Sequence, residues 1–256
     1  MEGGSKLLGL AIAGIIIAAW SFTLFLGLGL EVNQHEPLEL IGFVLIRAFL
    51  HTGLFIVAHD AMHTSLFPRS TFVNDLVGRI CLFLYGGLSY QFCRHNHHLH
   101  HRAPETCLDP DFLSSAAQSP FLWYIKFLRT YLHRNQFIIL GLTWASLFAS
   151  VAFRVSNSFL ILLLVCVLPM FISSLQLFIF GTWLPHRHLS VPNPLNSVSP
   201  RSLPLHPFIT FAACYHFSYH WEHHTFPAVP WYQLPRLHWL YQPDFTQDLL
   251  PVETPN

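Results

Sequence analysis

The sequence predicts an all-α integral membrane protein that forms a single domain over residues 1–256, with about four transmembrane helices, additional interfacial helices and a histidine-rich metal site at one end. Charged residues make up only 10% of the chain, whereas soluble domains contain about 25%. Hydrophobic residues make up 52%, and the mean hydropathy is +0.43. The apolar residues are concentrated in long uncharged segments, and histidine clusters lie at the ends of several of these segments.

Residues 7–30 form the first predicted span. These 24 residues include no charged side chain, and a helix of that length crosses about 30 Å of hydrocarbon. A cleaved secretory signal would have a shorter apolar core followed by a small-residue cleavage site. We therefore expect this helix to be retained.

Residues 38–58 form the second predicted span, which contains Arg47 and His51. Ionisable residues inside a span usually face the protein interior or a cavity, so these two serve either buried hydrogen bonding or a substrate channel. His51, His59 and His63 are separated by multiples of four residues. One helix face is therefore expected to run from the membrane interior to the first histidine pair.

The later helices follow from the alternation of apolar and polar segments. Residues 135–153 and 158–183 are uncharged and are predicted as the third and fourth spans. Pro169 is expected to kink the fourth. Three further helices are predicted outside the spans: 72–90 (interfacial or re-entrant), 121–134 (interfacial and amphipathic) and 208–224 (carrying the last histidine cluster).

Three histidine clusters are the strongest functional signal in the chain. The first is His59-x₃-His63, the second places five histidines within residues 95–101, and the third is His220-x₂-His223-His224. Residues three and four apart share one face of a helix, and neutral imidazole is a common metal ligand. The clusters therefore predict a metal site.

The number of imidazoles indicates two metal ions, because one zinc ion takes at most four ligands. A nitrogen-rich set without thiolate suits iron, zinc, copper or nickel. The predicted ligands are His59, His63, His97, His100, His101, His220, His223 and His224. A ninth ligand is expected to be His186, with His216 as the alternative. Hydrogen-bond partners of the ligands, or alternative ligands, are expected among His98, Asp60, Asp109, Asp111 and Glu222.

The basic residues predict the orientation in the membrane. With four spans and one re-entrant segment, both termini and all three clusters fall on one side. Most of the 13 lysines and arginines fall on that side as well, and only Arg154 falls on the other. By the positive-inside rule, the metal site and both termini are expected in the cytoplasm.

Composition also excludes several classes of function. The formal net charge is zero, which gives no electrostatic footprint for nucleic acid. The five cysteines are scattered and contain no C-x-x-C pair, so we expect neither a disulfide framework nor a zinc ribbon.

At this point the residues carry a resemblance to a known family. The segments concerned are 59–63, 97–102, 109–112, 181–187, 215–224 and 229–235. Their three-box pattern resembles the membrane fatty acid desaturase/hydroxylase superfamily of di-iron enzymes. The finer pattern is similar to the β-carotene ketolases (carotenoid 4-oxygenases) of bacteria and cyanobacteria. Thr64 stands where that pattern has a glycine.

The resemblance implies a carotenoid ketolase that binds two iron ions, uses O₂, and takes electrons from an external donor such as ferredoxin and its reductase. β-Carotene would enter from the membrane lipid with one ring end at the metals. The C4 methylene of that ring is allylic, so its C–H bond is weak. Two hydroxylations at C4 would give a gem-diol that loses water to the ketone. Reaction at one ring would give echinenone, and reaction at both would give canthaxanthin.

Other functions remain open from the residues alone. A carotenoid hydroxylase or a membrane fatty acid desaturase would have the same ligands. A membrane metal transporter would place its ionisable residues near the bilayer midplane, whereas these clusters lie at helix ends. A zinc hydrolase using metal-bound water would need fewer histidines.

Overall fold

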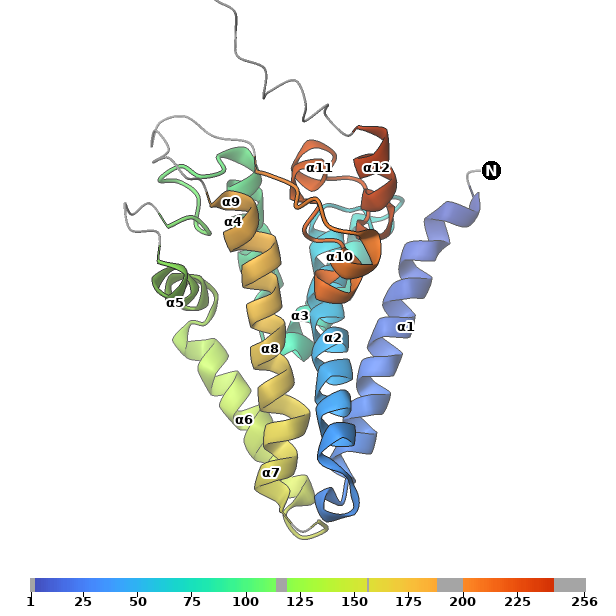
Figure 1. Cartoon of the computed structure of the whole chain (residues 1–256), viewed down its shortest axis with the longest axis vertical. Coiled ribbons are helices and arrows are strands. Elements are labelled where there is room, and N and C mark those ends of the chain that lie inside the picture. The colour runs from blue at the N-terminus through green and yellow to red at the C-terminus, as the bar shows by residue number, and fades with distance from the viewer. Residues whose placement is uncertain (1–2, 114–118, 156, 188–199, 242–256) are drawn as a thin grey trace, which may run out of the picture.

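The computed structural model describes residues 3–113, 119–155, 157–187 and 200–241, and every regular element in these ranges is a helix. Three helices are long and apolar enough to cross a membrane: Leu7–Leu28, Pro37–Met62 and Ser158–His186. They run along the length of the molecule, and α4, α9, α11 and α12 gather at the end where the N-terminus lies (Figure 1). Large apolar side chains such as Ile15, Phe22 and Phe25 are exposed on α1, as expected of a helix that faces lipid.

The first hairpin consists of α1 (Gly3–Leu28), the short helix η1 (Val32–Gln34) and α2 (Pro37–Met62). A capping box between Glu36 and Glu39, with Pro37 as the next residue, fixes the start of α2. Because α2 contacts α1, α3 and α8, it is the central helix. It brings His59 and His63 to the upper end of Figure 1, at its last turn and its C-cap.

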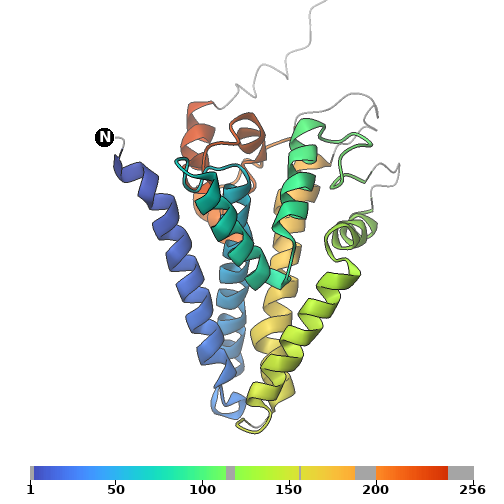
Figure 2. The same ribbon diagram turned by 180° about the vertical axis from the view of Figure 1, so that it is seen from behind.

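Helices α3 (Thr71–Gly86) and α4 (Tyr90–Arg102) form a bent pair with an angle of 101°. The side chain of Ser70 caps α3, Gly87 ends it with a left-handed φ of 67°, and Ser89 caps α4. Figure 2 shows that α3 descends to the middle of the molecule and α4 returns to the same end. This is the re-entrant arrangement predicted for residues 72–90.

Helix α5 (Pro120–Tyr131) lies across the long axis, and α6 (Arg134–Val151) descends from it (Figure 1). The third predicted span, residues 135–153, does form this helix. However, α6 has 18 residues and is not among the three helices that are long and apolar enough to span. Its first turn, Arg134-Asn135-Gln136, is polar, which shortens the apolar part.

The fourth predicted span is one continuous helix of 29 residues, Ser158–His186. It comprises α7 (Ser158–Leu162), α8 (Leu168–Leu177) and α9 (Leu184–His186), joined by two π-helical segments, Leu163–Val167 and Phe178–Trp183. The first π-helical segment ends at Val167, two residues before Pro169. Since proline has no amide hydrogen for the carbonyl four residues earlier, the wider π turn accommodates it.

The last predicted helix, residues 208–224, is wrong in part. The structure has α10 (Pro207–Cys214) and α11 (His220–Thr225), followed by η4 (Trp231–Gln233) and α12 (Leu234–Leu240). Tyr215 and His216 break the helix with positive φ values of 48° and 62°. Such values are uncommon for residues other than glycine, and neither side chain signals them in the sequence.

Candidate metal centre

Nine histidines from four helical segments converge at one end of the molecule. They come from the end of α2 (His59, His63), from α4 (His97, His100, His101), from α9 (His186) and from α11 (His220, His223, His224). They are the eight predicted ligands and the preferred ninth, and they divide into two groups. We call these the α2-side group (His59, His63, His97, His101, His223) and the α9-side group (His100, His186, His220, His224).

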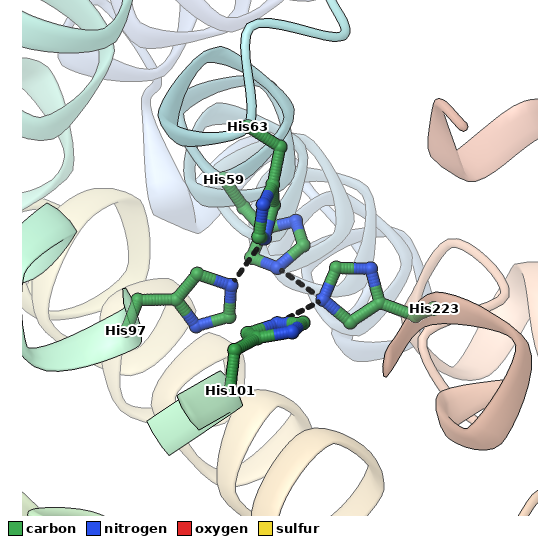
Figure 3. A group of neighbouring side chains, drawn as sticks. All are labelled: His59, His63, His97, His101 and His223. Carbon is green, nitrogen blue, oxygen red and sulfur yellow. Dashed lines mark hydrogen bonds between the residues drawn. The ribbon is translucent and has the colours of Figure 1, made fainter. Parts of the chain in front are cut away.

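The α2-side group places one ring nitrogen from each of five histidines within 4.8 Å of one another. Figure 3 shows the five rings pointing toward a common centre. The Nε2 atom of His63 lies 2.7 Å from Nε2 of His97. The Nε2 atom of His223 lies 3.1 Å from Nε2 of His59 and 2.8 Å from Nε2 of His101.

The α9-side group is arranged in the same way. The Nε2 atom of His224 lies 3.1 Å from Nε2 of His100 and 3.2 Å from Nε2 of His220. The ring of His186 completes this group, with its centroid 4.7 Å from that of His100 and 4.8 Å from that of His220.

The two groups are adjacent. The rings of His101, from the α2-side group, and His224, from the α9-side group, stack with centroids 4.1 Å apart and an interplanar angle of 12°. His100 and His101 are neighbours in α4 but belong to different groups. Successive residues of a helix are rotated by about 100°, so one helix contributes histidines to both groups.

The donor atoms fit metal ions. A neutral imidazole has one N–H donor and one acceptor nitrogen, yet Nε2 of His223 and Nε2 of His224 each meet two other Nε2 atoms. One proton cannot satisfy three converging nitrogens, whereas a shared cation can. With metal–nitrogen bonds of about 2.0–2.1 Å, ligands at right angles are about 2.9 Å apart, which matches the observed separations.

Two carboxyl groups position rings of the α9-side group by contacting Nδ1, the ring nitrogen that does not face the group. Nδ1 of His100 lies 2.9 Å from Oδ2 of Asp109, and Nδ1 of His186 lies 3.1 Å from Oε1 of Glu105. Both contacts leave Nε2 as the nitrogen that faces the group, and an ionised carboxylate in this position fixes the hydrogen on Nδ1. Asp109 was a predicted partner. Glu105 was missed, since nothing in its sequence context distinguishes it from a solvated carboxylate.

The other predicted partners make different contacts. Asp111 accepts a hydrogen bond from the hydroxyl of Tyr131 and lies beside His100 and Asp109. Asp60 accepts from the backbone amide of Trp231, and its oxygen is 3.8 Å from Nδ1 of His59. The remaining pairs are Nε2 of His98 with the Met62 carbonyl at 3.1 Å and Glu222 with Nδ1 of His238 at 2.6 Å. His238 had no sequence signal.

His216, the alternative ninth ligand, is in neither group. Its residue has a left-handed backbone, and its Nδ1 lies 2.7 Å from the hydroxyl of Thr210. The prediction placed it one helical turn before His220. The break between α10 and α11 removes that relationship, and His186 lies in the α9-side group instead.

Burial keeps the histidines of α11 in the form that binds metal. Burial, together with neighbouring histidines, lowers the pKa of His220, His223 and His224 well below the usual 6.5. They are therefore neutral at neutral pH. Burial, and then the charge of Asp109, raises the pKa of Glu105 to about 8, so in the metal-free protein this carboxyl holds a proton near neutrality.

A narrow cavity of about 40 Å³ reaches the double site. His59, His97, His100 and His220 line its metal end. Its other walls are mainly apolar and include Phe55, Phe127, Leu177 and Phe217. Histidines of both groups therefore line a cavity whose other walls are mainly apolar.

Comparisons with known proteins agree with this geometry. The model of the fatty acid desaturase family matches residues 37–255. A β-carotene ketolase of Paracoccus sp. (strain N81106 / MBIC 01143) is 36% identical over 229 residues, 88% of this chain and 90% of the relative. A β-carotene ketolase of Paracoccus sp. (strain PC1) is 35% identical over 240 residues, 91% of this chain and 93% of the relative. A zeaxanthin 4-ketolase of Chlamydomonas reinhardtii is 31% identical over 249 residues, 91% of this chain and 53% of the relative.

Proposed function

The chain belongs to the fatty acid desaturase family, and we propose that within this family it is a membrane carotenoid 4-ketolase. The observation that carries the proposal is the double histidine site at the end of an apolar cavity, in a chain similar along most of its length to named β-carotene ketolases. It is an oxidoreductase, and its proposed substrate is β-carotene taken from the bilayer.

The proposed cofactor is a pair of iron ions. The α2-side group would hold one ion, and the α9-side group would hold the other. Family membership and an all-nitrogen donor set support iron, and nine histidines on rigid helices support two ions. When bound, the irons would supply the reductive activation of O₂.

The protein residues then bind and orient the substrate. Phe55, Phe127 and Leu177 would hold the ring end in the cavity, so that C4 faces the histidines. Asp109 and Glu105 would hold two ligand rings in one tautomer. Positioning of this kind supplies much of an enzyme's rate advantage, because the reacting atoms meet in one geometry.

The proposed reaction replaces the two C4 hydrogens by a ketone oxygen. Each hydroxylation consumes one O₂, two electrons and two protons, converts C–H into C–OH, and releases one water. The second round at the same carbon gives a gem-diol, which loses water. An external donor, for which a ferredoxin with its reductase is the proposed source, supplies the electrons.

We place the metal site on the cytoplasmic side. The N-terminus, α12 and the histidine groups lie at one end of the molecule (Figure 1), and Arg154 lies at the opposite end, in the turn between α6 and α7. The positive-inside rule supports this orientation. The helix-end position of the histidine groups also argues against a transporter, whose site would lie near the midplane.

The test is pigment analysis in bacteria that already make β-carotene and that express this chain. Keto-carotenoids are the expected product. Hydroxylated carotenoids would move the chain to a hydroxylase activity, and unchanged β-carotene with iron-loaded protein would turn attention to fatty acyl substrates.

Alanine at any of the nine histidines should abolish product. His35→Ala is the matched control, because His35 lies in the loop before α2, far from the site, and its side chain contacts only Glu39 among the described interactions.

A further inference from the structure

Three cavities lie in series along the inner face of α2. The first is the 40 Å³ cavity at the double site, and the second is a larger cavity of about 210 Å³. These two share the walls Phe55, Phe127, Tyr131 and Leu177. The second and the third, of about 60 Å³, share the walls Tyr85, Gly86, Leu140 and Met170.

The series extends from the metal end deep into the molecule. His59 lines the first cavity, Phe55 lines the first and second, and Arg47 lines the third. With a rise of 1.5 Å per residue, the step from His59 to Arg47 covers about 18 Å along α2. A ligand that fills the series is therefore long and extended.

The middle cavity is suited to a hydrocarbon. Leucine, methionine and aromatic side chains of α5 and α8 dominate its walls. Its three tyrosine hydroxyls are already engaged: Tyr85 with Ser173 at 3.3 Å, Tyr124 with Ser174 at 2.6 Å and Tyr131 with Asp111 at 2.7 Å. The ligand therefore meets ring faces and methyl groups, and it needs no polar group to pair with the wall.

The polar residues of the third cavity are engaged as well. Nε of Arg47 donates to the Val165 carbonyl, and Nη1 of Arg47 donates to the Trp20 carbonyl. Nδ1 of His51 accepts from the indole of Trp20, and Nε2 of His51 donates to the Tyr85 carbonyl. These contacts favour a structural role for both residues. The third cavity therefore lengthens the space available to the ligand rather than adding a polar site that recognises it.

Gly86 stands at the junction of the second and third cavities. It is the last residue of α3, whereas the left-handed position belongs to Gly87. A Cβ atom added at Gly86 would meet only the sulfur of Met170, at 3.9 Å, which is an ordinary contact. The backbone therefore tolerates a side chain here, and that side chain would enter the passage.

We infer that the three cavities form one substrate tunnel that takes a long, extended polyene hydrocarbon, and that the missing side chain of Gly86 sets its depth. One end of the ligand lies at the histidines, and the chain passes Phe55 and Tyr131 into the middle cavity. Its far part lies beyond Gly86. The inference rests on the proposed function for the identity of the ligand.

The test compares purified wild-type protein with Gly86→Leu and Met170→Trp, which obstruct the junction from opposite walls. Each protein is isolated from cells that make β-carotene, and the pigment retained per protein is measured by absorbance, beside the keto-carotenoid yield in the cells. Both variants should retain about tenfold less pigment and yield correspondingly less product, while Gly86→Ala stays near wild type. Equal thermal unfolding midpoints and equal metal content establish that the variants are folded.

Gly141→Leu is the matched control. Gly141 is an exposed residue of α6, and an added Cβ there meets nothing within 4 Å. Undiminished pigment and product in both junction variants would overturn the tunnel, and so would an equal loss in Gly141→Leu. A wild-type protein that neither retains carotenoid nor makes keto-carotenoid would instead reject the proposed function, so the two failures are distinguishable.

Discussion

Nε of Arg47 lies 3.1 Å from the carbonyl oxygen of Val165. Val165 is four residues before Pro169, which cannot supply the usual helical amide hydrogen to this carbonyl. The arginine supplies the donor instead, and its Nη1 also donates to the Trp20 carbonyl at 2.8 Å. One buried side chain therefore joins α1, α2 and the π-helical segment of the last span, where an unpaired carbonyl would be costly.

Removing this donor should destabilise the protein. Arg47→Met removes the side-chain donor of the buried Val165 carbonyl, and a buried carbonyl that loses its donor costs about 1–3 kcal/mol. The free energy of unfolding in detergent should fall accordingly. Pro169→Ala restores an amide hydrogen near Val165, so the double variant should lose less than Arg47→Met alone. Strict additivity of the two single effects would contradict the coupling.

Asp109 should control metal affinity without being a ligand. Asp109→Asn keeps the shape of the side chain but removes the charge that orients the His100 ring. Losses of roughly ten- to a hundredfold are typical for such partners, so the iron content after dialysis against a chelator should drop. Asp75→Asn, which alters an ion pair with Arg94 away from both groups, should leave iron content unchanged. Equal iron retention in both variants would argue against the positioning role.

His186 and His216 should behave differently. His186→Ala removes a member of the α9-side group, so bound iron and keto-carotenoid should both be lost. His216→Ala removes a hydrogen bond to Thr210 and should retain iron, with a modest loss of stability of about 1 kcal/mol. Metal analysis of the two purified variants decides between them, and the reverse result would reinstate His216 as the ligand.

The histidines that converge could be predicted because histidine spacing is local, but their division into two groups could not. Within α4, His97 and His101 face one group and His100 faces the other. That assignment depends on where α2, α9 and α11 lie around α4. The residues of α4 alone do not specify how the other helices pack around it. The role of Glu105 likewise depends on its distance from His186, a residue 81 positions away.

The helix prediction succeeded for α1, α2 and the last span because long, predominantly apolar segments have few alternatives in a membrane. It was wrong at residues 215–216, where apolar side chains continue across a left-handed break. The broken α3–α4 pair could be anticipated from a short apolar segment followed by a polar one. The series of cavities could not, since its walls are formed by residues from α1 to α6, α8 and α11.

Acid should destabilise the metal-free protein. The folded state holds the pKa of His220 and His223 well below 6.5, chiefly through burial, whereas the unfolded chain titrates near that value. Below that pH the unfolded chain binds more protons than the folded chain. The free energy of unfolding therefore decreases as the pH is lowered, by up to about 1.4 kcal/mol per pH unit for each histidine. Unfolding midpoints between about pH 7.5 and about pH 5.5 should show this slope. In the His220→Gln/His223→Gln variant the slope should be shallower, and an unchanged slope would exclude these residues as its source.

Thr64 should be a site where the protein can be stabilised. Its φ is 59°, a left-handed value that costs an L-residue roughly 1–2 kcal/mol and is least suited to a β-branched side chain. Glycine adopts this conformation freely but loses more conformational entropy on folding, so Thr64→Gly should raise the free energy of unfolding by about 1 kcal/mol or less. Asn157, with a φ of 64°, is the control, because asparagine tolerates this region and Asn157→Gly should change little. Thermal unfolding of both variants measures the difference.

Thr64 follows His63 directly, so the iron content of Thr64→Gly is measured as well. An unchanged iron content would show that the substitution relieves the turn without displacing His63. A destabilised Thr64→Gly would show instead that the threonine side chain makes a favourable contact that outweighs its backbone.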